Sequence, residues 1–361
     1  MITFYIVILL IIFLYYYFYI QKKKTIHKFW DNQPVSRNNI TLKTGIISST
    51  PFFKIKMNKD YKFTYLNPRN SSKQIVNFIN THFSKSYQYT ENFLINTLGY
   101  NKKGYNVGLF YKNSLIGFIH SKPVTLSIKN DLINLYYVDY LCIHNEFRNR
   151  NLAAILISKL INDHHDKSKC FIFKKDKYQL PFNYITSSNY YYLELGSIHS
   201  KIENINVGNS ISYCDKNNLT ELYQFIITES KTHECYQYFN EKEFIELYSN
   251  SSKKIIIERN NKKEICGYLI YINIVFRSNS DFTKTVDIEN MFLMKNSGLF
   301  DFLIKECNDK KIKIISCLDI SKNNYIINKY QMNKSFPIFY HMYNYHISNK
   351  ILKKNLCFNY L

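Results

Sequence analysis

The 361-residue chain is poor in the residues that break regular structure, with only 9 glycines and 6 prolines. This scarcity excludes a collagen-like or linker-like chain. Acidic residues are also few: 27 Asp and Glu stand against 48 Lys and Arg, which gives a net charge of +21. Intrinsic disorder is excluded, because 27 Phe and 33 Tyr provide ample surface to bury. An AT-rich coding sequence would itself raise the Lys, Asn, Ile and Tyr content. The charge therefore indicates acidic partners only in general terms: phosphate-bearing cofactors, anionic lipid or nucleic acid.

Cysteine and histidine patterns typical of metal sites are missing. The eight cysteines form no Cys-x-x-Cys pair, and the ten histidines form no His-Glu-x-x-His motif. Several cysteines lie inside apolar runs, as Cys142 does between Leu141 and Ile143. We therefore expect buried, reduced thiols and no metal ligands, with a catalytic thiol as the alternative.

The N-terminus carries a long apolar run. Residues 2–20 contain no charged side chain, and as a helix they would span roughly 28 Å, close to the ~30 Å hydrocarbon core of a bilayer. Three lysines, residues 22–24, follow the run, whereas a signal peptide carries its charge in front of it. We expect an uncleaved transmembrane anchor over residues 1–21, with the rest of this single-pass protein facing the cytosol. A buried helix or strand pair is the alternative.

After the anchor, apolar periodicity alternates between the helical and the extended pattern. Residues 22–59 show weak periodicity and are expected to form an arm that lies on the rest of the protein. We expect helices over 71–83, 152–161, 221–227, 241–247 and 298–307, and strands over 105–110, 114–119, 132–143, 255–258, 265–272 and 312–318. The fold class is α+β or mixed α/β, with room for two similar halves.

A strand, a basic loop and an apolar helix follow one another over residues 137–161. The loop carries Arg148 and Arg150 immediately before the helix. Backbone N–H groups and the dipole at a helix N-terminus attract anions, and the arginines add charge. By itself, the pattern fits either an anion site or an ordinary solvated loop.

Several short motifs resemble, in the same order, those of the N-myristoyltransferase family. They are His27–Val35 (HKFWDNQPV), Ser114–Ile119 (SLIGFI), Asp139–His144 (DYLCIH), Phe147–Ala154 (FRNRNLAA), Leu180–Pro181, Leu318–Asp319 with Asn323, and Tyr340–Asn344 (YHMYN). The resemblance extends from residue 27 to residue 361, about where the chains of that family stop. The ordered set is more specific than any one motif.

The resemblance implies two fused GNAT-type acyltransferase halves. Residues 22–200 would bind acyl-CoA, and residues 201–361 would bind most of a peptide. The implied reaction transfers a myristoyl group from myristoyl-CoA to the α-amino group of an N-terminal glycine, with no prosthetic group. Implied partners are myristoyl-CoA, glycine-initiated peptides of substrate proteins and, through the anchor, membrane lipid. We expect a monomer without specific nucleic-acid binding.

The resemblance also implies a site. The backbone N–H groups of Tyr140 and Leu141 would form an oxyanion hole, and the α-carboxylate of Leu361 would be the general base. The implied acyl-CoA contacts are Lys28, Phe29, Trp30, Tyr140, Leu141, Cys142, Ile143, Arg148, Asn149, Arg150, Asn151, Leu152 and Ala153. A base at the chain end predicts that residues 355–361 are buried.

The sequence departs from the family at several positions. Asp139 replaces an Asn of the oxyanion strand, and Lys175 falls near a family Thr, so that these two side chains could form a pair. The acidic loop of the family is missing after Phe83, and the anion loop at 149–151 has lost one positive charge and a hydroxyl. A non-catalytic relative that binds acyl-CoA or peptides is therefore the alternative function. A GNAT-type acetyltransferase, or a basic protein binding a membrane surface or nucleic acid, is the third.

Overall fold

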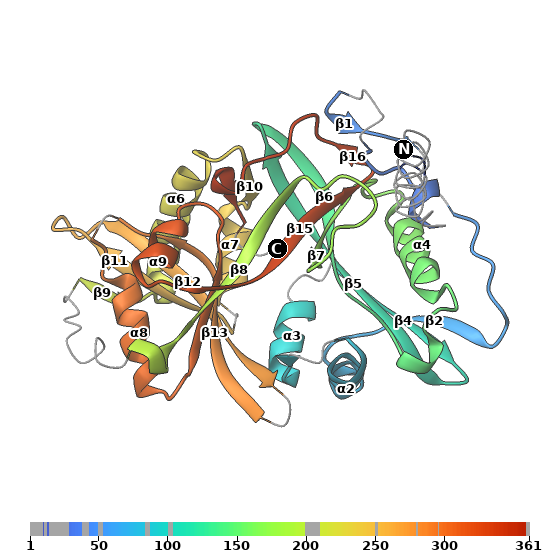
Figure 1. Cartoon of the computed structure of the whole chain (residues 1–361), viewed down its shortest axis with the longest axis horizontal. Helices are drawn as coiled ribbons and strands as arrows, with labels where there is room; N and C mark the ends of the chain where they lie inside the picture. The colour runs from blue at the N-terminus through green and yellow to red at the C-terminus, as the bar shows by residue number, and fades with distance from the viewer. Residues whose placement is uncertain are drawn as a thin grey trace, which may run out of the picture. The chain divides into compact units, whose positions relative to one another are not determined.

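The computed structural model describes residues 10, 13, 29–37, 43–49, 53–83, 87–99, 104–198, 210–249, 252–278, 281–294 and 296–358 (Figure 1). The chain divides into two compact units, Met1–Gln33 and Pro34–Leu361. The first contains the 3-10 turn η1 (Trp30–Asn32), where the rings of Phe29 and Trp30 lie 4.9 Å apart. Except for Leu10 and Phe13, the predicted anchor over residues 1–21 lies outside the described residues. Within the described part of the chain, no helix is long and apolar enough to cross a membrane.

The second unit is a mixed α/β structure. Its helices are α2 (Ser72–His82), α3 (Glu91–Gly99), α4 (Leu152–His164), α6 (Leu219–Ser230), α7 (Glu241–Ser249), α8 (Leu299–Asp309) and α9 (Asn324–Lys329). Its strands are β1 (Gly45–Ile46), β2 (Tyr61–Tyr65), β3 (Tyr87–Gln88), β4 (Tyr105–Tyr111), β5 (Ser114–Ile128), β6 (Asp131–Ile143), β7 (Phe171–Asp176), β8 (Thr186–Glu194), β9 (Ile211–Tyr213), β10 (Cys235–Tyr238), β11 (Lys254–Arg259), β12 (Ile265–Ser278), β13 (Asp281–Phe292), β14 (Ile314–Leu318), β15 (Asn333–Tyr343), β16 (Tyr345–His346) and β17 (Leu356–Cys357). The 3-10 turns are η2 (Asn145–Phe147), η3 (Leu195–Ile198), η4 (Lys216–Asn218) and η5 (Lys353–Asn355).

Most strands of the described residues join one large sheet. Its order is β17-β10-β5-β6-β7-β15-β8-β14-β13-β12-β11-β9, with β4 and β2 continuing from β5 and β3 pairing with β12. The late strand β15 therefore lies between β7 and β8 and is antiparallel to both, as Figure 1 shows. A strand from near the end of the sequence thus lies between two strands from its middle.

The second unit contains the same order of elements twice. Apart from 3-10 turns, the first copy is β2-α2-β3-α3-β4-β5-β6-α4-β7, and the second is β9-α6-β10-α7-β11-β12-β13-α8-β14. In each copy three antiparallel strands lead into a helix, and the strand after the helix pairs in parallel with the strand before it. The predicted boundary between residues 200 and 201 lies between the copies, outside the described residues, and stays a prediction.

A glycine lets the helix approach the middle strand closely in each copy. A Cβ added to Gly117 of β5 would lie 2.8 Å from Leu156 Cδ1 of α4, and one added to Gly267 of β12 would lie 3.0 Å from Leu299 Cδ1 of α8. Both distances are shorter than van der Waals contact, so a larger residue would push the helix away. These glycines bring the N-terminal part of each helix close to the sheet.

Apolar periodicity predicted the helices α2, α4, α6, α7 and α8 and the existence of β4, β5, β6, β11, β12 and β14. The strands β5 and β12 are longer than predicted, since they reach Ile128 and Ser278. The helix α3 and the strands β7, β8, β13 and β15 were not predicted.

The described part of the predicted arm lies along the end of the chain. Val35 forms a bridge with Tyr343, and Asn344 N–H donates to Pro34 O at 2.8 Å. Further on, β1 pairs with β16. The arm thus contacts residues some 300 positions away, which agrees with the expectation that it lies on the rest of the protein.

Candidate functional site

A bulge interrupts β6 at Tyr140. The register shifts between Phe118 and His120 of β5, so that Ile119 alone faces both Tyr140 and Leu141. Tyr140 has a φ of 53°, which lies in the left-handed region. This conformation is unfavourable for a residue with a bulky side chain and marks local strain. At a bulge, backbone groups leave the regular ladder and become available to other partners. The predicted pair Tyr140 and Leu141 therefore falls on an irregular place in the strand.

The strand continues through η2 into the N-terminus of α4. Asn149 and Asn151 adopt left-handed φ values of 64° and 62°, which fold the turn tightly against the helix start. No side chain of the described residues caps α4 at Asn151. The positive end of the helix dipole is therefore left without a capping group, which is the arrangement that binds anions.

The two arginines of this turn have different places. Arg148 Nε donates to Ile143 O at 3.3 Å, and its Nη2 donates to His82 O at 2.6 Å, so Arg148 joins the end of β6 to the end of α2. The guanidinium of Arg150 lies 4.9 Å from the ring centroid of Phe147, and its side chain is exposed. Of the two, Arg150 is the one that a bound anion could contact without disturbing the turn.

Beside the bulge, one face of the sheet carries charged and hydroxyl side chains. Cross-strand partners share a face, and this face contains the pairs Lys122 with Tyr137, Lys174 with Tyr340, and Asp287 with Ser316. We call it the polar face; it comprises Lys122, Tyr137, Asp139, Lys174, Asp176, Tyr190, Asp287, Ser316 and Tyr340. Four of these side chains are buried: Lys122, Tyr137, Ser316 and Tyr340. Buried polar side chains on one face of a sheet are unusual, and their presence indicates a binding site.

The first part of the polar face surrounds Tyr137. The ammonium groups of Lys122 and Lys174 lie 5.1 and 5.5 Å from its ring centroid. Its hydroxyl donates to Asp139 Oδ2 at 3.0 Å, and Asp139 Oδ1 accepts the N–H of Tyr140 at 2.7 Å. Lys122 is 6% exposed. Burial, followed by the charge of neighbouring lysines, lowers the pKa of Lys122, whereas Glu289 and then Asp139 favour its charged form.

The second part surrounds Asp287. Its Oδ1 accepts hydrogen bonds from the hydroxyls of Tyr190 and, at 2.9 Å, Ser316. Burial raises the pKa of Asp287 to about 6, although the two hydrogen bonds act in the opposite direction. Nearby, Lys253 and Glu289 form an ion pair, and burial lowers the pKa of Lys253 to about 8.

The chain end approaches the polar face. β17 pairs in parallel with β10, and Phe358 is 3% exposed. The ring of Phe358 lies 5.3 Å from that of Tyr340, and its carbonyl accepts a hydrogen bond from Asn290 Nδ2 at 3.2 Å. The predicted burial of the chain end is therefore confirmed for residues 356–358. Residues 359–361, with the predicted base Leu361, lie outside the described residues.

The bulge and the uncapped helix lie in a segment with known relatives. Residues 44–171 match the family model of the "Myristoyl-CoA:protein N-myristoyltransferase, N-terminal domain". The chain is a relative of the N-myristoyltransferases. It is 24% identical over 162 residues to the glycylpeptide N-tetradecanoyltransferase of Plasmodium falciparum, a match that covers 38% of this chain and 39% of that relative. The chain thus spans about two fifths of the length of the first curated relatives.

Two further likenesses cover more of the chain. A putative glycylpeptide N-tetradecanoyltransferase of Amsacta moorei entomopoxvirus is 21% identical over 243 residues, which cover 64% of this chain and 74% of that relative. The crystal structure of Saccharomyces cerevisiae N-myristoyltransferase with bound myristoyl-CoA covers 91% of both chains with a TM-score of 0.77 and 13% identity. At that identity the likeness shows the fold, and the fold predicted from the resemblance, a mixed α/β structure of the N-myristoyltransferase type, is confirmed.

In this relative of the N-myristoyltransferases, the predicted contacts from Tyr140 to Ala153 form one continuous segment of strand, turn and helix. Lys28 lies outside the described residues, and Phe29 and Trp30 belong to the first compact unit. Cys142 is buried, and burial raises its pKa to about 12, which disfavours the alternative of a catalytic thiol there. Among the described residues, no group of three His, Cys, Asp or Glu side chains could hold a metal ion.

Two details of the prediction were wrong. Lys175 is exposed and does not contact Asp139; its neighbour Lys174 lies on the polar face. The strand predicted over 132–143 was taken as regular, which would put Cys142 and Tyr137 on opposite faces, but the bulge adds a residue and brings both to one face. Sequence reasoning also missed Lys122, whose signal was a lysine inside the long apolar strand β5.

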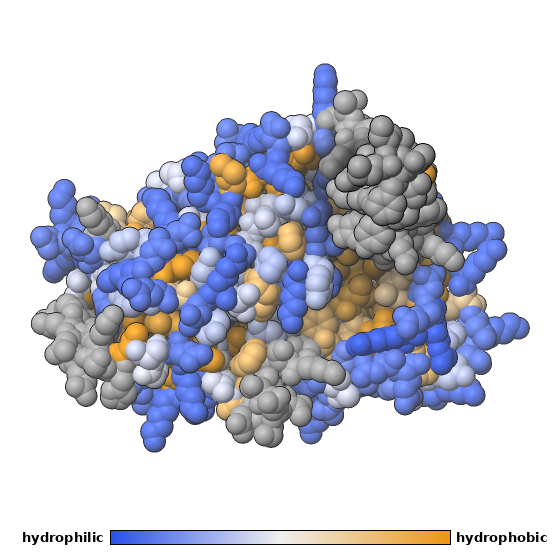
Figure 2. Space-filling model, in the orientation of Figure 1, coloured by the Kyte–Doolittle hydropathy of each residue, from blue (hydrophilic) through white to orange (hydrophobic). Residues whose placement is uncertain are grey.

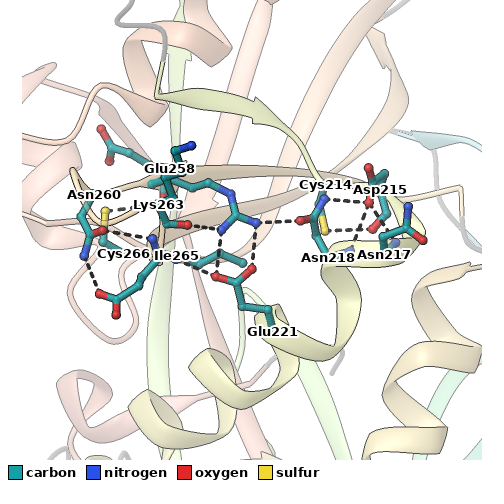
Figure 3. A network of polar contacts seen from close by, with 12 residues as sticks. Cys214, Asp215, Asn217, Asn218, Glu221, Glu258, Asn260, Lys263, Ile265 and Cys266 are labelled. Atoms are coloured by element: carbon teal, nitrogen blue, oxygen red, sulfur yellow. Dashed lines mark hydrogen bonds and ion pairs between the residues drawn. The ribbon is translucent and has the colours of Figure 1, made fainter.

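In the second copy of the repeated elements, the helix that corresponds to α4 is α8, and a side chain of the protein itself occupies its N-terminus. Glu258 of β11 accepts hydrogen bonds from Ser297 Oγ at 2.5 Å and from Gly298 N at 3.2 Å, directly at the start of α8. Its neighbour Arg259 donates to both carboxylate oxygens of Glu221 at 2.8 Å, in the network of Figure 3. A carboxylate of the chain itself therefore occupies the N-terminus of α8.

Proposed function

We propose that the chain transfers a myristoyl group from myristoyl-CoA to the α-amino group of an N-terminal glycine. One observation carries this proposal: within one strand–turn–helix segment, a strained bulge at Tyr140 is followed by an uncapped helix N-terminus at Asn151. Such a segment can hold a carbonyl oxygen at one end and phosphate groups at the other. The family match of residues 44–171 supports the same activity.

The phosphate groups of the acyl donor would lie at the start of α4. The uncapped N–H groups from Leu152 and Ala153 and the exposed guanidinium of Arg150 provide positive charge there. For the acyl chain, Figure 2 shows apolar side chains recessed between hydrophilic ones in the region where Figure 1 places β5. The donor is a substrate in this proposal, and no prosthetic group takes part.

The bulge would stabilise the charge that develops during the reaction. The neutral amine attacks the thioester carbonyl carbon, so a C–N bond forms while the carbonyl electron pair moves onto oxygen. The N–H groups of Tyr140 and Leu141 donate to that oxygen. When the intermediate collapses, the C–S bond breaks and CoA leaves as a thiolate. A donor of this type contributes about 10²- to 10³-fold to the rate in other acyltransfer enzymes.

The proton balance requires a base, and the α-carboxylate of Leu361 has that role in the proposal. An N-terminal ammonium has a pKa of roughly 8, so a carboxylate close to it needs only to accept one proton. That proton passes to solvent before the attack, and the second proton, which the nitrogen loses when the intermediate collapses, goes to the departing thiolate. The burial of residues 356–358 beside Tyr340 of the polar face supports this assignment.

The alternative is a non-catalytic relative that binds acyl-CoA or glycine-initiated peptides. The contact that favours it is the hydrogen bond from the Tyr140 amide to Asp139 Oδ1, because this amide is one of the two that the reaction needs.

We also propose that residues 1–21 attach a monomeric enzyme to a membrane, with residues 22–361 in the cytosol. Fractionation of cells that express the chain with and without residues 1–21 tests the attachment.

The activity is tested with the full chain, carrying its native C-terminus. The protein is incubated with myristoyl-CoA and a mixed panel of glycine-initiated peptides, and products are identified by mass spectrometry. We expect a gain of one myristoyl group on peptide α-amines. Binding of myristoyl-CoA without any product would select the non-catalytic alternative.

The base is tested by one added glycine after Leu361, which moves the terminal carboxylate. We expect product formation to fall by about 10²-fold or more, in the range that general base catalysis contributes. The matched control is Leu361→Met, which keeps the carboxylate in place and should retain activity. Full activity of the extended chain would show that another group accepts the proton.

A further inference from the structure

The second copy also has a bulge, and it orients a buried asparagine. Glu289 is the extra residue of this bulge in β13. The partners of Asn290 and Asp287 on β12 are two residues apart, so both side chains lie on one side of the sheet. Without the extra residue, positions 287 and 290 would lie on opposite sides. The bulge thus places Asn290, which is 4% exposed, on the same side of the sheet as the polar face.

Asn290 joins the chain end to the second copy. Its Oδ1 accepts the hydroxyl of Tyr268 at 2.6 Å, and its Nδ2 donates to Phe358 O at 3.2 Å. A carbonyl can only accept, so the contact with Phe358 fixes the amide with its oxygen toward Tyr268. The same Nδ2 lies 3.6 Å from Cys357 Sγ, which also contacts Ser230 Oγ at 3.4 Å. All of these residues are buried, so water does not compete for their hydrogen bonds.

The strand at the chain end is short. β17 pairs with β10 over two residues, Leu356 and Cys357, and Phe358 follows directly. The ring of Phe358 lies 5.3 Å from that of Tyr340, which belongs to the polar face. Three residues follow Phe358 in the sequence, and an extended chain of three residues spans roughly 11 Å at most. The position of Phe358 therefore limits where the terminal carboxylate can lie.

Resting on the proposed function, we propose that Asn290 is a positioning residue for the general base. By holding the Phe358 carbonyl, it keeps the α-carboxylate of Leu361 within reach of the substrate amine, and Tyr268 orients the amide that does so. Asn290 itself contacts neither the substrates nor the reacting atoms, and no bond forms or breaks in this step. The two bulges then have complementary tasks: the one in β6 presents amides to the oxyanion, and the one in β13 presents the side chain that holds the base.

The first measurement asks whether Asn290 holds the chain end, and it needs no turnover. Asn290→Leu keeps the size of the side chain and removes both hydrogen-bonding groups. The full chain is treated with a carboxypeptidase, and the release of residues is followed by mass spectrometry. Removal of Phe358 requires the chain end to leave its place, so its rate follows the population of the open form. We expect this rate to rise about tenfold in Asn290→Leu, the size expected for one hydrogen bond.

The second measurement asks whether this contact matters for the base. With saturating myristoyl-CoA and a glycine-initiated peptide, Asn290→Leu should lower kcat by about tenfold or more, because small misplacements of a reacting group are costly. The affinity for myristoyl-CoA, which binds at the first copy in the proposed function, should stay within about 2-fold. In a chain with one glycine added after Leu361 the base has already moved, so Asn290→Leu should change kcat by less than about 2-fold.

Asn323→Leu is the matched control. Asn323 is also 4% exposed, and its Nδ2 donates to a backbone carbonyl, that of Leu318, at 2.8 Å. Its loss should lower the temperature of thermal unfolding as much as Asn290→Leu does, but without the tenfold changes in digestion and in kcat. Tyr268→Phe is the milder second variant: it removes only the hydroxyl that orients Asn290 and should change both quantities in the same direction by about 3-fold.

An unchanged rate of digestion in Asn290→Leu would overturn the inference. The same loss of kcat with and without the added glycine would also overturn it, as would equal effects from Asn323→Leu. Faster digestion of Asn290→Leu, in a protein that transfers nothing to any peptide, would support the hold of Asn290 on the chain end and refute the transfer on which its role rests.

Discussion

The repeated strand–bulge–helix segment shows how one arrangement can be left open or closed. In the first copy, β6 bulges at Tyr140 and leads to α4, which no side chain of the described residues caps. In the second, β13 has an extra residue at Glu289 and leads to α8, whose start is occupied by Glu258. The same order of elements thus provides a place for an external anion in one half and an internal hydrogen bond in the other.

The arginines differ in the same way. Arg259 beside Glu258 is held on both sides of its guanidinium by Glu221, whereas Arg150 beside α4 only stacks on Phe147 and is exposed. Where the charges of the chain satisfy one another, the segment contributes to stability. Where they do not, it can bind a ligand, and this difference is why we propose that the phosphate groups of an acyl donor lie at the first copy.

The largest effect is expected from Asp287, the buried carboxylate of the second half. Its pKa of about 6 lies above the ordinary 3.8, so between these values the folded protein binds the proton more tightly than the unfolded chain. This stabilisation is fully present below about pH 4 and is lost as the pH rises through about 6. Between pH 4 and pH 7, the free energy of unfolding should therefore fall by up to about 3 kcal/mol less in Asp287→Asn than in the unsubstituted protein.

Urea unfolding at several pH values measures this difference. Asp139→Asn, which changes a carboxylate of the first half, is the matched comparison. An unchanged pH profile in Asp287→Asn would show that burial of this carboxylate does not affect stability.

Glu258→Gln opens the closed helix start. It weakens the hydrogen bonds from Ser297 and Gly298 and removes the negative charge at the dipole of α8, so the free energy of unfolding should fall by about 1–2 kcal/mol. Affinity for myristoyl-CoA should stay the same within about 2-fold. Glu264→Gln, on the neighbouring hairpin, is the control for charge alone. A change in myristoyl-CoA affinity would contradict the assignment of the phosphates to α4.

Asn151→Asp closes the open helix start. A carboxylate at this position imitates Glu258 and repels phosphate groups, so affinity for myristoyl-CoA should fall about tenfold, or about 1.4 kcal/mol. Stability should change by less than about 0.5 kcal/mol, since Asp and Asn serve equally well at helix starts. Asn113→Asp is the control, because Asn113 also has a left-handed φ, of 68°, but lies in the β4–β5 turn. Equal losses of affinity in both variants would indicate a general effect of charge.

Local patterns in the sequence predicted the parts of the site that lie close together in the chain. The strand, turn and helix from residue 137 to residue 161 could be recognised, because their apolar periodicity changes from extended to helical within a few residues. The bulge at Tyr140 could not, since an extra residue in a strand has no composition of its own. It was the resemblance to a family that pointed to Tyr140 and Leu141.

The polar face could not be predicted, because it depends on strand order. Lys122, Lys174 and Asp287 are roughly 50 to 165 residues apart in the sequence. They share a face only because their strands lie in one sheet, in the order β5-β6-β7-β15-β8-β14-β13. A lysine or aspartate in an apolar strand indicates something unusual, but it does not indicate its partners.

The position of β15 determines when the centre of the sheet can form during synthesis. This strand lies between β7 and β8, and β17 completes the edge beside β10. The arm, too, contacts residues 343–346. Until β15 has been made, the two halves can fold but the centre of the sheet stays open. The polar face is therefore completed late, after both copies of the repeated order of elements have been made.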